Sequence, residues 1–248
     1  MTRNAATADT ARRAASGIVF VTALMLAAPA LAGDRALVEY IGYSSDGRYF
    51  AFEEFGVQDG SGFPFSTIYV VDLAADRWVS GSPYRAWIDS DDADVGDARD
   101  MAYDLAEAKL DELDIGGPAH PLAVNGDGEP GASVGHELVF GEPGYGLGEV
   151  MNERILALET FPLASAEDCA ITGDDVLGFA LMLDGTQIHR DAGPLPKSRG
   201  CTQGYKIYAV VKPAEWSLAA GGLLAVISYY PFGFEGPDRR FLVVPLRP

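Results

Sequence analysis

The chain of 248 residues carries 36 Asp and Glu residues against 18 Lys and Arg residues, which gives a formal net charge of −18 at pH 7. Such a surface would repel a polyanion, and no stripe rich in Lys or Arg compensates, so the composition excludes a nucleic-acid-binding protein. The length suits one domain with a sizeable core, and no linker rich in Pro or Ser divides the chain.

The N-terminus has the features of a cleavable export signal. Three arginines precede an apolar run from Ile18 to Ala28, which is too short to span a bilayer comfortably. Ala30-Leu31-Ala32 has the small-x-small form of a cleavage site. We therefore expect residues 1–32 to be a signal peptide, which is removed on export to the periplasm or the medium. Residues 33–248 would then form a single β-rich domain with no stable membrane span. An uncleaved membrane anchor is the alternative, and it would need about 20 apolar residues.

The stretch from Tyr43 to Leu73 predicts two strands around a long Gly-rich loop. Ser44-Ser45-Asp46-Gly47 has the side chains of a tight turn, Tyr49–Phe52 follows with strand-forming aromatics, and Ile68–Val71 is a second, β-branched run. The pattern resembles the single repeat of TolB-type periplasmic propellers, with Ser45 in the place of the usual Pro. A full propeller needs at least about four blades, each with its own signature, and we find one clear copy. An incomplete propeller-like β fold is therefore an alternative architecture.

A helix is predicted from about Asp97 to Leu113. Apolar residues recur at helical spacing on one side of it: Ala98, Met101, Ala102, Leu105, Ala106 and Leu113. The opposite side is acidic and could recruit divalent cations or a basic partner. Ligands lined along a rod do not wrap around an ion, however, so we interpret this side as a solvated face. Gly116-Gly117-Pro118 would end the helix.

Further strand signals follow, separated by Gly, Pro, Asn and Asp: Glu137–Phe140, Arg154–Phe161, Gly178–Leu183, Tyr205–Val211, Leu223–Tyr229 and Phe241–Leu246. Short strands with turn-rich connections and one amphipathic helix predict a mainly β fold. We expect an antiparallel β-sheet or sandwich-like domain.

Two parts of the chain look like duplicated hairpins. Gly47–Phe52 lines up with Gly221–Val226, and Val70–Leu73 lines up with Val243–Leu246. If the hairpins are equivalent, they lie in the same sheet or in facing sheets and bring their aromatic loops to one end. The identities are few, so chance similarity is an equal alternative.

Cys169 and Cys201 are the two cysteines of the chain. In an oxidising compartment an even count favours a structural disulfide, which would close a loop of about 33 residues. Neither cysteine sits in a Cys-x-x-Cys motif or has a His at ligand spacing, which disfavours a catalytic or metal-binding pair.

Three segments are similar to an uncharacterised bacterial family of predicted secreted proteins: Glu53–Ser66, Lys197–Cys201 and Tyr230–Phe241. The resemblance spans most of the chain after residue 32. It implies export and a single fold unit, and it implies no activity.

No catalytic motif survives a check of its context. Gly131-Ala132-Ser133-Val134-Gly135 has the spacing of a nucleophile elbow, but no strand is predicted before it and no helix after it. His120, His136 and His189 are far apart and form no His-Glu-x-x-His motif. We therefore predict no catalytic residues, no metal site and no cofactor. A zinc site assembled from separate loops is the remaining alternative.

Two loops rich in Gly and aromatic residues, Phe55–Phe65 and Tyr229–Phe241, are the candidates for a binding surface. Aromatic side chains with a few polar groups serve in the recognition of sugars, peptides and protein surfaces. Arg239 and Arg240 would hydrogen-bond an anionic or hydroxyl-rich ligand. The other candidate ligand-binding residues are Lys197, Arg199, Asp59, Phe63 and Phe234. The competing interpretation is that the aromatics cap the ends of the β core.

We accordingly predict an exported envelope protein that binds an unknown envelope ligand or protein without catalysis. A hydrolase acting on envelope sugars or peptides is the alternative, and a cleft with a carboxylate and a His would favour it. Glu53 and Glu54 cannot flank one bond together, because adjacent strand residues point to opposite faces. We expect Arg239 and Arg240 to be exposed, so that replacing both by Ala leaves the melting temperature nearly unchanged.

Overall fold

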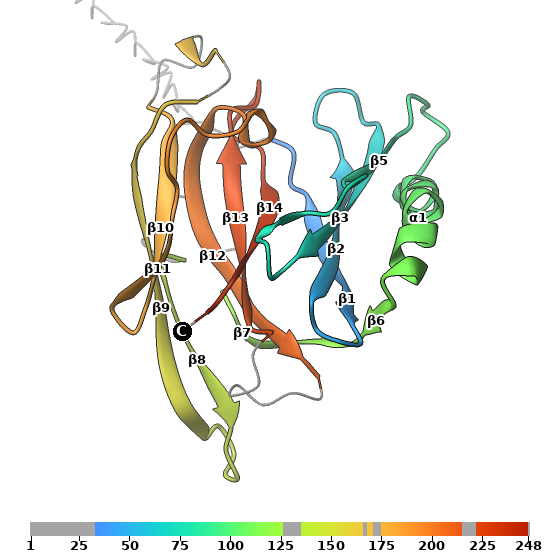
Figure 1. Cartoon of the computed structure of the whole chain (residues 1–248). Coiled ribbons are helices and arrows are strands. Elements are labelled where there is room, and N and C mark those ends of the chain that lie inside the picture. Colours follow the sequence, from blue (N-terminus) through green and yellow to red (C-terminus); the bar gives the residue numbers. More distant parts are fainter. Residues whose placement is uncertain (1–32, 126–134, 166–167, 171–174, 215–221, 248) are drawn as a thin grey trace, which may run out of the picture. The chain divides into compact units, whose positions relative to one another are not determined.

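A computed structural model describes residues 33–125, 135–165, 168–170, 175–214 and 222–247. All of them belong to the compact unit Leu31–Pro248. The predicted signal peptide, residues 1–32, and residues 131–134 of the elbow motif lie outside the described residues. The described residues form three antiparallel sheets and one α-helix (Figure 1).

The first sheet has the strand order β4-β3-β2-β1-β6, and β5 also pairs with β3. Its strands are β1 (Leu37–Ser44), β2 (Tyr49–Val57), β3 (Pro64–Asp72), β4 (Arg77–Trp78), β5 (Tyr84–Trp87) and β6 (Ile115–Gly117). β2 and β3 contain the predicted aromatic and β-branched runs. They pair as a hairpin without a register shift, from Tyr49 with Asp72 to Val57 with Pro64.

The second sheet has the order β11-β10-β9-β8, and the third has the order β14-β13-β12-β7. Their strands are β7 (Ala119–Val124), β8 (Glu137–Pro143), β9 (Val150–Pro162), β10 (Leu177–Leu183), β11 (Thr186–Arg190), β12 (Thr202–Pro213), β13 (Leu224–Pro231) and β14 (Arg240–Pro245). The mainly β, antiparallel prediction is confirmed. The propeller-like alternative is wrong, because the described residues form three sheets that share cores rather than repeated blades.

The third sheet is buried on both faces. On β13, Leu224 and Val226 belong to the core shared with the first sheet, whereas Ala225 and Ile227 belong to the core shared with the second sheet. Neighbouring side chains on a strand point to opposite faces, so a strand between two cores needs a continuous apolar run. This explains why residues 223–227 are apolar without alternation.

Helix α1 (Val95–Glu112) packs on the other face of the first sheet. Asp94 caps it, because its carboxylate accepts from the backbone N–H of Asp97 and the Asp97 side chain accepts from the backbone N–H of Asp94. The buried stripe of the helix is Ala98, Ala102, Ala106 and Leu110. Residues four apart share one helix face, and small alanines let that face lie close to the sheet.

The predicted apolar side of the helix is partly wrong. Met101 and Leu105 are 45% and 54% exposed, because they flank the narrow stripe that contacts the sheet. The predicted end of the helix at about Leu113 is confirmed, but Gly116-Gly117-Pro118 is not what ends it. The helix ends with Leu113 as its C-cap, Asp114 has a φ of 51°, and Gly117 pairs with β1 as part of β6.

Both hairpins of the proposed duplication form, but their registers differ by one residue. Phe50 pairs with Val71 in the first hairpin, whereas the aligned Leu224 pairs with Pro245 rather than with Val244 in the second. A shift of one residue turns a strand over. Val71 accordingly faces the core between the first and third sheets, and Val244 faces the opposite core. The alignment holds for the first strand of each hairpin and fails for the second.

Candidate functional site

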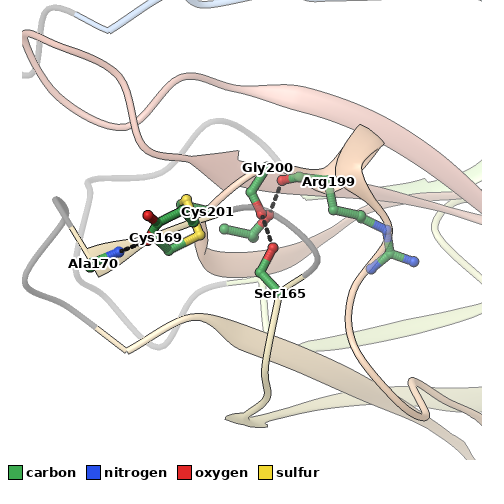
Figure 2. Close-up of a disulfide and its surroundings, with 8 residues drawn as sticks. Ser165, Cys169, Ala170, Arg199, Gly200 and Cys201 are labelled. Carbon is green, nitrogen blue, oxygen red and sulfur yellow. Dashed lines mark hydrogen bonds between the residues drawn. A yellow bond between two sulfur atoms is a disulfide. The ribbon is translucent and has the colours of Figure 1, made fainter.

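The predicted disulfide between Cys169 and Cys201 is present, with the two α-carbons 5.6 Å apart (Figure 2). Cys201 lies two residues after the end of the short 3-10 helix η2 (Lys197–Arg199). The hydroxyl of Ser165 donates to the carbonyl of Gly200 at 3.2 Å in the same region. The disulfide and this hydrogen bond tether η2 to the segment that follows β9.

A pocket of about 380 Å³ lies beside η2, within the size range of small-molecule sites. Strands β2, β3 and β5 supply one part of its lining, and β13, β14 and η2 supply the other. The lining brings together four cationic side chains from separate parts of the chain: Arg85, Lys197, Arg199 and Arg240. Sequence reasoning had named the last three as site residues and had missed Arg85.

Strand pairing aligns the side chains that the first sheet contributes. Glu54 on β2, Thr67 on β3 and Arg85 on β5 are direct cross-strand neighbours. Phe65 and Trp87 form a second row. Side chains two residues apart on a strand share a face, so Arg85 and Trp87 project to the same side, where both line the pocket.

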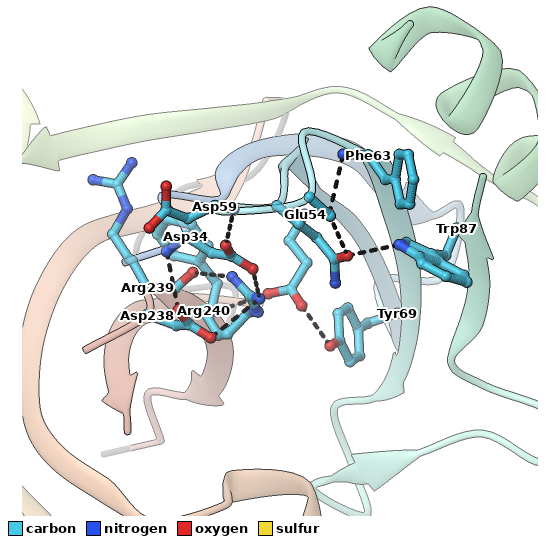
Figure 3. A network of polar contacts seen from close by, with 12 residues as sticks. Asp34, Glu54, Asp59, Phe63, Tyr69, Trp87, Asp238, Arg239 and Arg240 are labelled. Carbon is cyan, nitrogen blue, oxygen red and sulfur yellow. Dashed lines mark hydrogen bonds and ion pairs between the residues drawn. The ribbon is translucent and has the colours of Figure 1, made fainter. Parts of the chain in front are cut away.

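Among the described lining residues, Glu54 is the single carboxylate. It is 3% exposed, and it accepts hydrogen bonds from the Tyr69 hydroxyl at 2.8 Å and from the backbone N–H of Phe241 at 3.0 Å (Figure 3). Burial raises the pKa of the Glu54 carboxyl, although the charge of Arg240 and both hydrogen bonds oppose the increase. Carboxyls with a raised pKa occur at functional sites and also in structural polar networks.

Carboxylates outside the pocket lining hold Arg240 in place. Its guanidinium forms ion pairs with Asp34 at 2.8 Å and Asp238 at 3.5 Å, and it lies 4.8 Å from the centre of the Phe65 ring (Figure 3). The Arg240 side chain is 18% exposed. The Arg240 guanidinium is therefore engaged mainly in ion pairs within the protein.

Arg239 does not line the pocket. It is 4% exposed, and its Nε donates to the carbonyl of Ala36 at 3.0 Å. The expectation that Arg239 and Arg240 are exposed is wrong. Removing both would leave buried acceptors and carboxylates without their partners, so the expectation of a nearly unchanged melting temperature is withdrawn.

The other two predicted cations of the pocket lie on η2. Arg199 pairs with Asp191 at 3.2 Å and donates to the Tyr205 hydroxyl at 3.1 Å. Lys197 lies two residues before it on the same turn. Arg85 differs from Arg199 and Arg240, because it is exposed and forms no hydrogen bond or ion pair with another described residue.

The two aromatic loops approach each other at one end of their hairpins. The backbone N–H of Asp59 donates to the Asp34 carboxylate at 2.5 Å, and Asp34 in turn pairs with Arg240. The nearby Asp59 carboxyl raises the pKa of Glu235, through a hydrogen bond to the protonated form and through charge repulsion. The loops therefore lie near one end, as the hairpin comparison predicted. The proposed duplication agrees with the structure only for the first strand of each hairpin.

Three predicted site residues on these loops do not line the pocket: Asp59, Phe63 and Phe234. The Phe63 ring lies edge-on to Trp87 with centroids 5.8 Å apart, so it supports the indole from outside. Phe234 is 97% exposed. The structure thus gathers three of the seven predicted ligand-binding residues in one pocket.

The sequence was compared with models of known protein families, and one of them matches. The model of the family described as "Predicted secreted protein (DUF2259)" matches residues 51–247. The chain belongs to this family. The membership confirms the prediction of a secreted protein, and the resemblance to a TolB-type repeat is not supported. The comparisons with curated proteins and with solved structures found no match.

In the parts of this secreted protein that the structure describes, no helix is long and apolar enough to cross a membrane. Nor do three or more His, Cys, Asp or Glu side chains of those parts gather as metal ligands would. None of the three histidines is among the described lining residues of the pocket. His120 and His136 are exposed, and His189 stacks on Phe179 with centroids 4.8 Å apart.

A sequence signal for the missed part of the pocket was present. Two of the four residues of Tyr84-Arg85-Ala86-Trp87 are aromatic, which favours a strand, and in a strand Arg85 and Trp87 would lie on one face. The run is four residues long, and nothing in it indicates pairing with β3. The partner strand is what turns these two side chains toward Glu54 and Thr67.

Proposed function

We propose that this secreted protein is a non-catalytic binding module, which holds a small anionic ligand in the pocket beside η2. The observation that supports the proposal most strongly is the convergence of Arg85, Lys197, Arg199 and Arg240 on one pocket. The chain as a whole has a formal net charge of −18. An acidic surface repels anions in general, so a local group of cations gives this pocket an attractive potential that its surroundings lack.

The four cations contribute unequally to this binding. Arg199 and Arg240 are paired with carboxylates that offset much of their charge, so they mainly form firm pocket walls. Arg85 has no such partner among the described residues and lies next to the Thr67 hydroxyl, which makes it the first contact for an anion. A charge-assisted hydrogen bond to its guanidinium would anchor the ligand.

Replacing Arg85 by Ala is expected to weaken the binding of a small anion at least about tenfold, since a hydrogen bond to a charged group contributes about 1.5–3 kcal/mol. Isothermal titration calorimetry with inorganic phosphate, citrate and galacturonate measures the change. Arg77→Ala is the matched control, because Arg77 is an exposed arginine on β4 of the same sheet and does not line this pocket. If no anion binds the wild type, or if both replacements weaken binding equally, the pocket is not the anion site.

A hydrolase acting on envelope sugars or peptides is the second candidate, and Glu54 is the observation that favours it. Its carboxyl lines the pocket and has a raised pKa, which suits a general acid. The carboxyl already accepts two hydrogen bonds, and no described histidine accompanies it. Cleavage of glycans or peptides by the pure protein, abolished in Glu54→Gln, would replace the binding proposal by this one.

The same replacement tests the titration of Glu54. A raised pKa in the folded state means that the native protein holds this proton more tightly than the unfolded chain does. The wild type should therefore gain stability relative to Glu54→Gln as the pH falls from neutral, through the raised pKa, to the ordinary value of 4.5. This advantage disappears as the pH rises through the folded-state pKa. Thermal unfolding at pH 7 and pH 4.5 measures it, and a trend in the opposite direction would show that Arg240 outweighs burial.

A further inference from the structure

The residues that line the pocket indicate the chemical class of the ligand as well as the sign of its charge. We infer that the ligand is an acidic saccharide, with one carboxylate on a sugar ring, as in a uronic acid. This inference rests on the proposed binding function of the pocket. Three features of the lining support it: a subsite for one carboxylate, an aromatic platform beside that subsite, and a surrounding set of hydroxyl and amide groups.

Arg85 and Thr67 form the carboxylate subsite. They are cross-strand neighbours on β5 and β3, both line the pocket, and neither side chain forms a hydrogen bond with another described residue. Thr67 is 7% exposed and lines the pocket, so little of it is open to bulk solvent. A guanidinium presents two parallel N–H groups that match the two oxygens of a carboxylate, and the adjacent hydroxyl can donate a further hydrogen bond.

Glu54 limits the charge that this subsite accepts. It is the next residue in the same cross-strand row, on the other side of Thr67. A dianionic phosphate group at Thr67 would lie close to the Glu54 carboxyl and would oppose its ionisation further, whereas a single carboxylate engages Arg85 with less repulsion. The row Glu54, Thr67, Arg85 therefore favours a monoanionic ligand.

Trp87 supplies the platform for the ring. It lies two residues after Arg85 on β5, so the two side chains project from one face with α-carbons about 6.5 Å apart. The indole N–H donates to the Gln58 side chain at 2.7 Å, and the Phe63 ring braces the indole edge-on (Figure 3). Trp87 is 52% exposed, so part of the indole stays uncovered. A fixed, uncovered ring beside a cation can stack on the apolar face of a sugar whose carboxylate reaches Arg85.

The remaining polar lining suits hydroxyl groups. Gln58, Tyr69, Ser198 and Tyr229 each carry a hydroxyl or amide group. The Tyr229 hydroxyl donates to the Ser198 carbonyl at 3.3 Å, and the Tyr69 hydroxyl donates to Glu54. Their oxygens keep acceptor capacity, and groups that both donate and accept can pair with sugar hydroxyls in either sense. An aromatic carboxylate would offer these groups no hydroxyl with which to pair, which disfavours it.

Calorimetric titrations with defined probes test the inference: galacturonic acid and tri-galacturonic acid, the neutral sugar galactose, benzoate, and glucose 6-phosphate. We expect both uronates to bind at least about tenfold more tightly than galactose, because galactose lacks the ion pair with Arg85. The monomer and the trimer distinguish a free sugar acid from the end of a glycan chain. Benzoate and glucose 6-phosphate should bind more weakly than the uronates.

Variants separate the two subsites. Arg85→Ala should reduce the affinity for galacturonate to that for galactose, with Arg77→Ala as the control for charge. Trp87→Ala should weaken both sugars about three- to tenfold, and Trp87→Phe should restore most of the loss, because it keeps a ring. Melting temperatures verify that each variant is folded. If benzoate or glucose 6-phosphate binds as tightly as the uronates, or if Trp87→Ala changes nothing, the saccharide inference is wrong and the anion pocket stands. If no probe binds, the saccharide inference is wrong, and if inorganic phosphate and citrate also fail to bind, the proposed function fails with it.

Discussion

Replacing both Cys169 and Cys201 by Ser is expected to lower the free energy of unfolding by about 3–4 kcal/mol. The disulfide joins residues 32 positions apart, and breaking it frees that loop in the unfolded chain. Urea unfolding of the variant and of the oxidised wild type measures the loss.

The same replacement should also weaken anion binding. The bond ends at Cys201, two residues after Arg199, and tethers the turn that carries two cations of the pocket. Reduced wild-type protein is the control, since it should match the variant in both stability and affinity. An unchanged affinity in a destabilised variant would show that η2 keeps its position without the disulfide.

Replacing Arg99 by Ala is expected to lower the free energy of unfolding by about 3 kcal/mol. Arg99 joins α1 to the first sheet through Glu53, to which its Nε and Nη2 donate at 3.1 and 2.8 Å. Glu53 is 5% exposed, so the variant would bury a carboxylate that keeps the Ser66 hydroxyl at 2.7 Å as its remaining partner. The value lies at the lower end of the range for broken buried pairs because the Arg99 side chain is 34% exposed.

Two further variants test this explanation. Adding Glu53→Gln to Arg99→Ala should recover much of the loss, because it removes the unpaired charge and keeps an acceptor for Ser66. Arg154→Ala is the surface control. It breaks an ion pair with Asp184, whose side chain is 45% exposed, and should cost less than about 1 kcal/mol. Equal losses for Arg99→Ala and Arg154→Ala would show that the burial of Glu53 does not matter.

Strand β2 shows which part of the site sequence reasoning could predict and which part it could not. Adjacent strand residues point to opposite faces, so Glu53 and Glu54 had to separate. In the structure Glu53 bonds the helix through Arg99 and Glu54 lines the pocket. Which of the two would face which side could not be predicted, because that depends on the sheet and helix that pack against β2.

Arg239 and Arg240, at the start of β14, show where sequence reasoning failed. Arg239 and Arg240 follow a Gly-rich loop, and a charged pair in such a place favours exposure. Residues 34 and 36, more than 200 positions earlier in the chain, supply the acceptors that hold the two side chains inside the fold. No local pattern contains such a contact, so the exposure of the two residues was predicted wrongly.

By itself the sequence determined the features that depend on local chemistry. Strand runs, the helix, the expectation of export and the even number of cysteines follow from periodicity and composition, which each segment carries within itself. The tertiary structure alone decided the pocket. Lys197, Arg199 and Arg240 meet Arg85 and Trp87 there because β5 pairs with β3 in one particular register and the disulfide holds η2 beside them. A shift of one residue in that register would turn Arg85 and Trp87 to the other face of the sheet, and the residues of β5 alone do not specify the register.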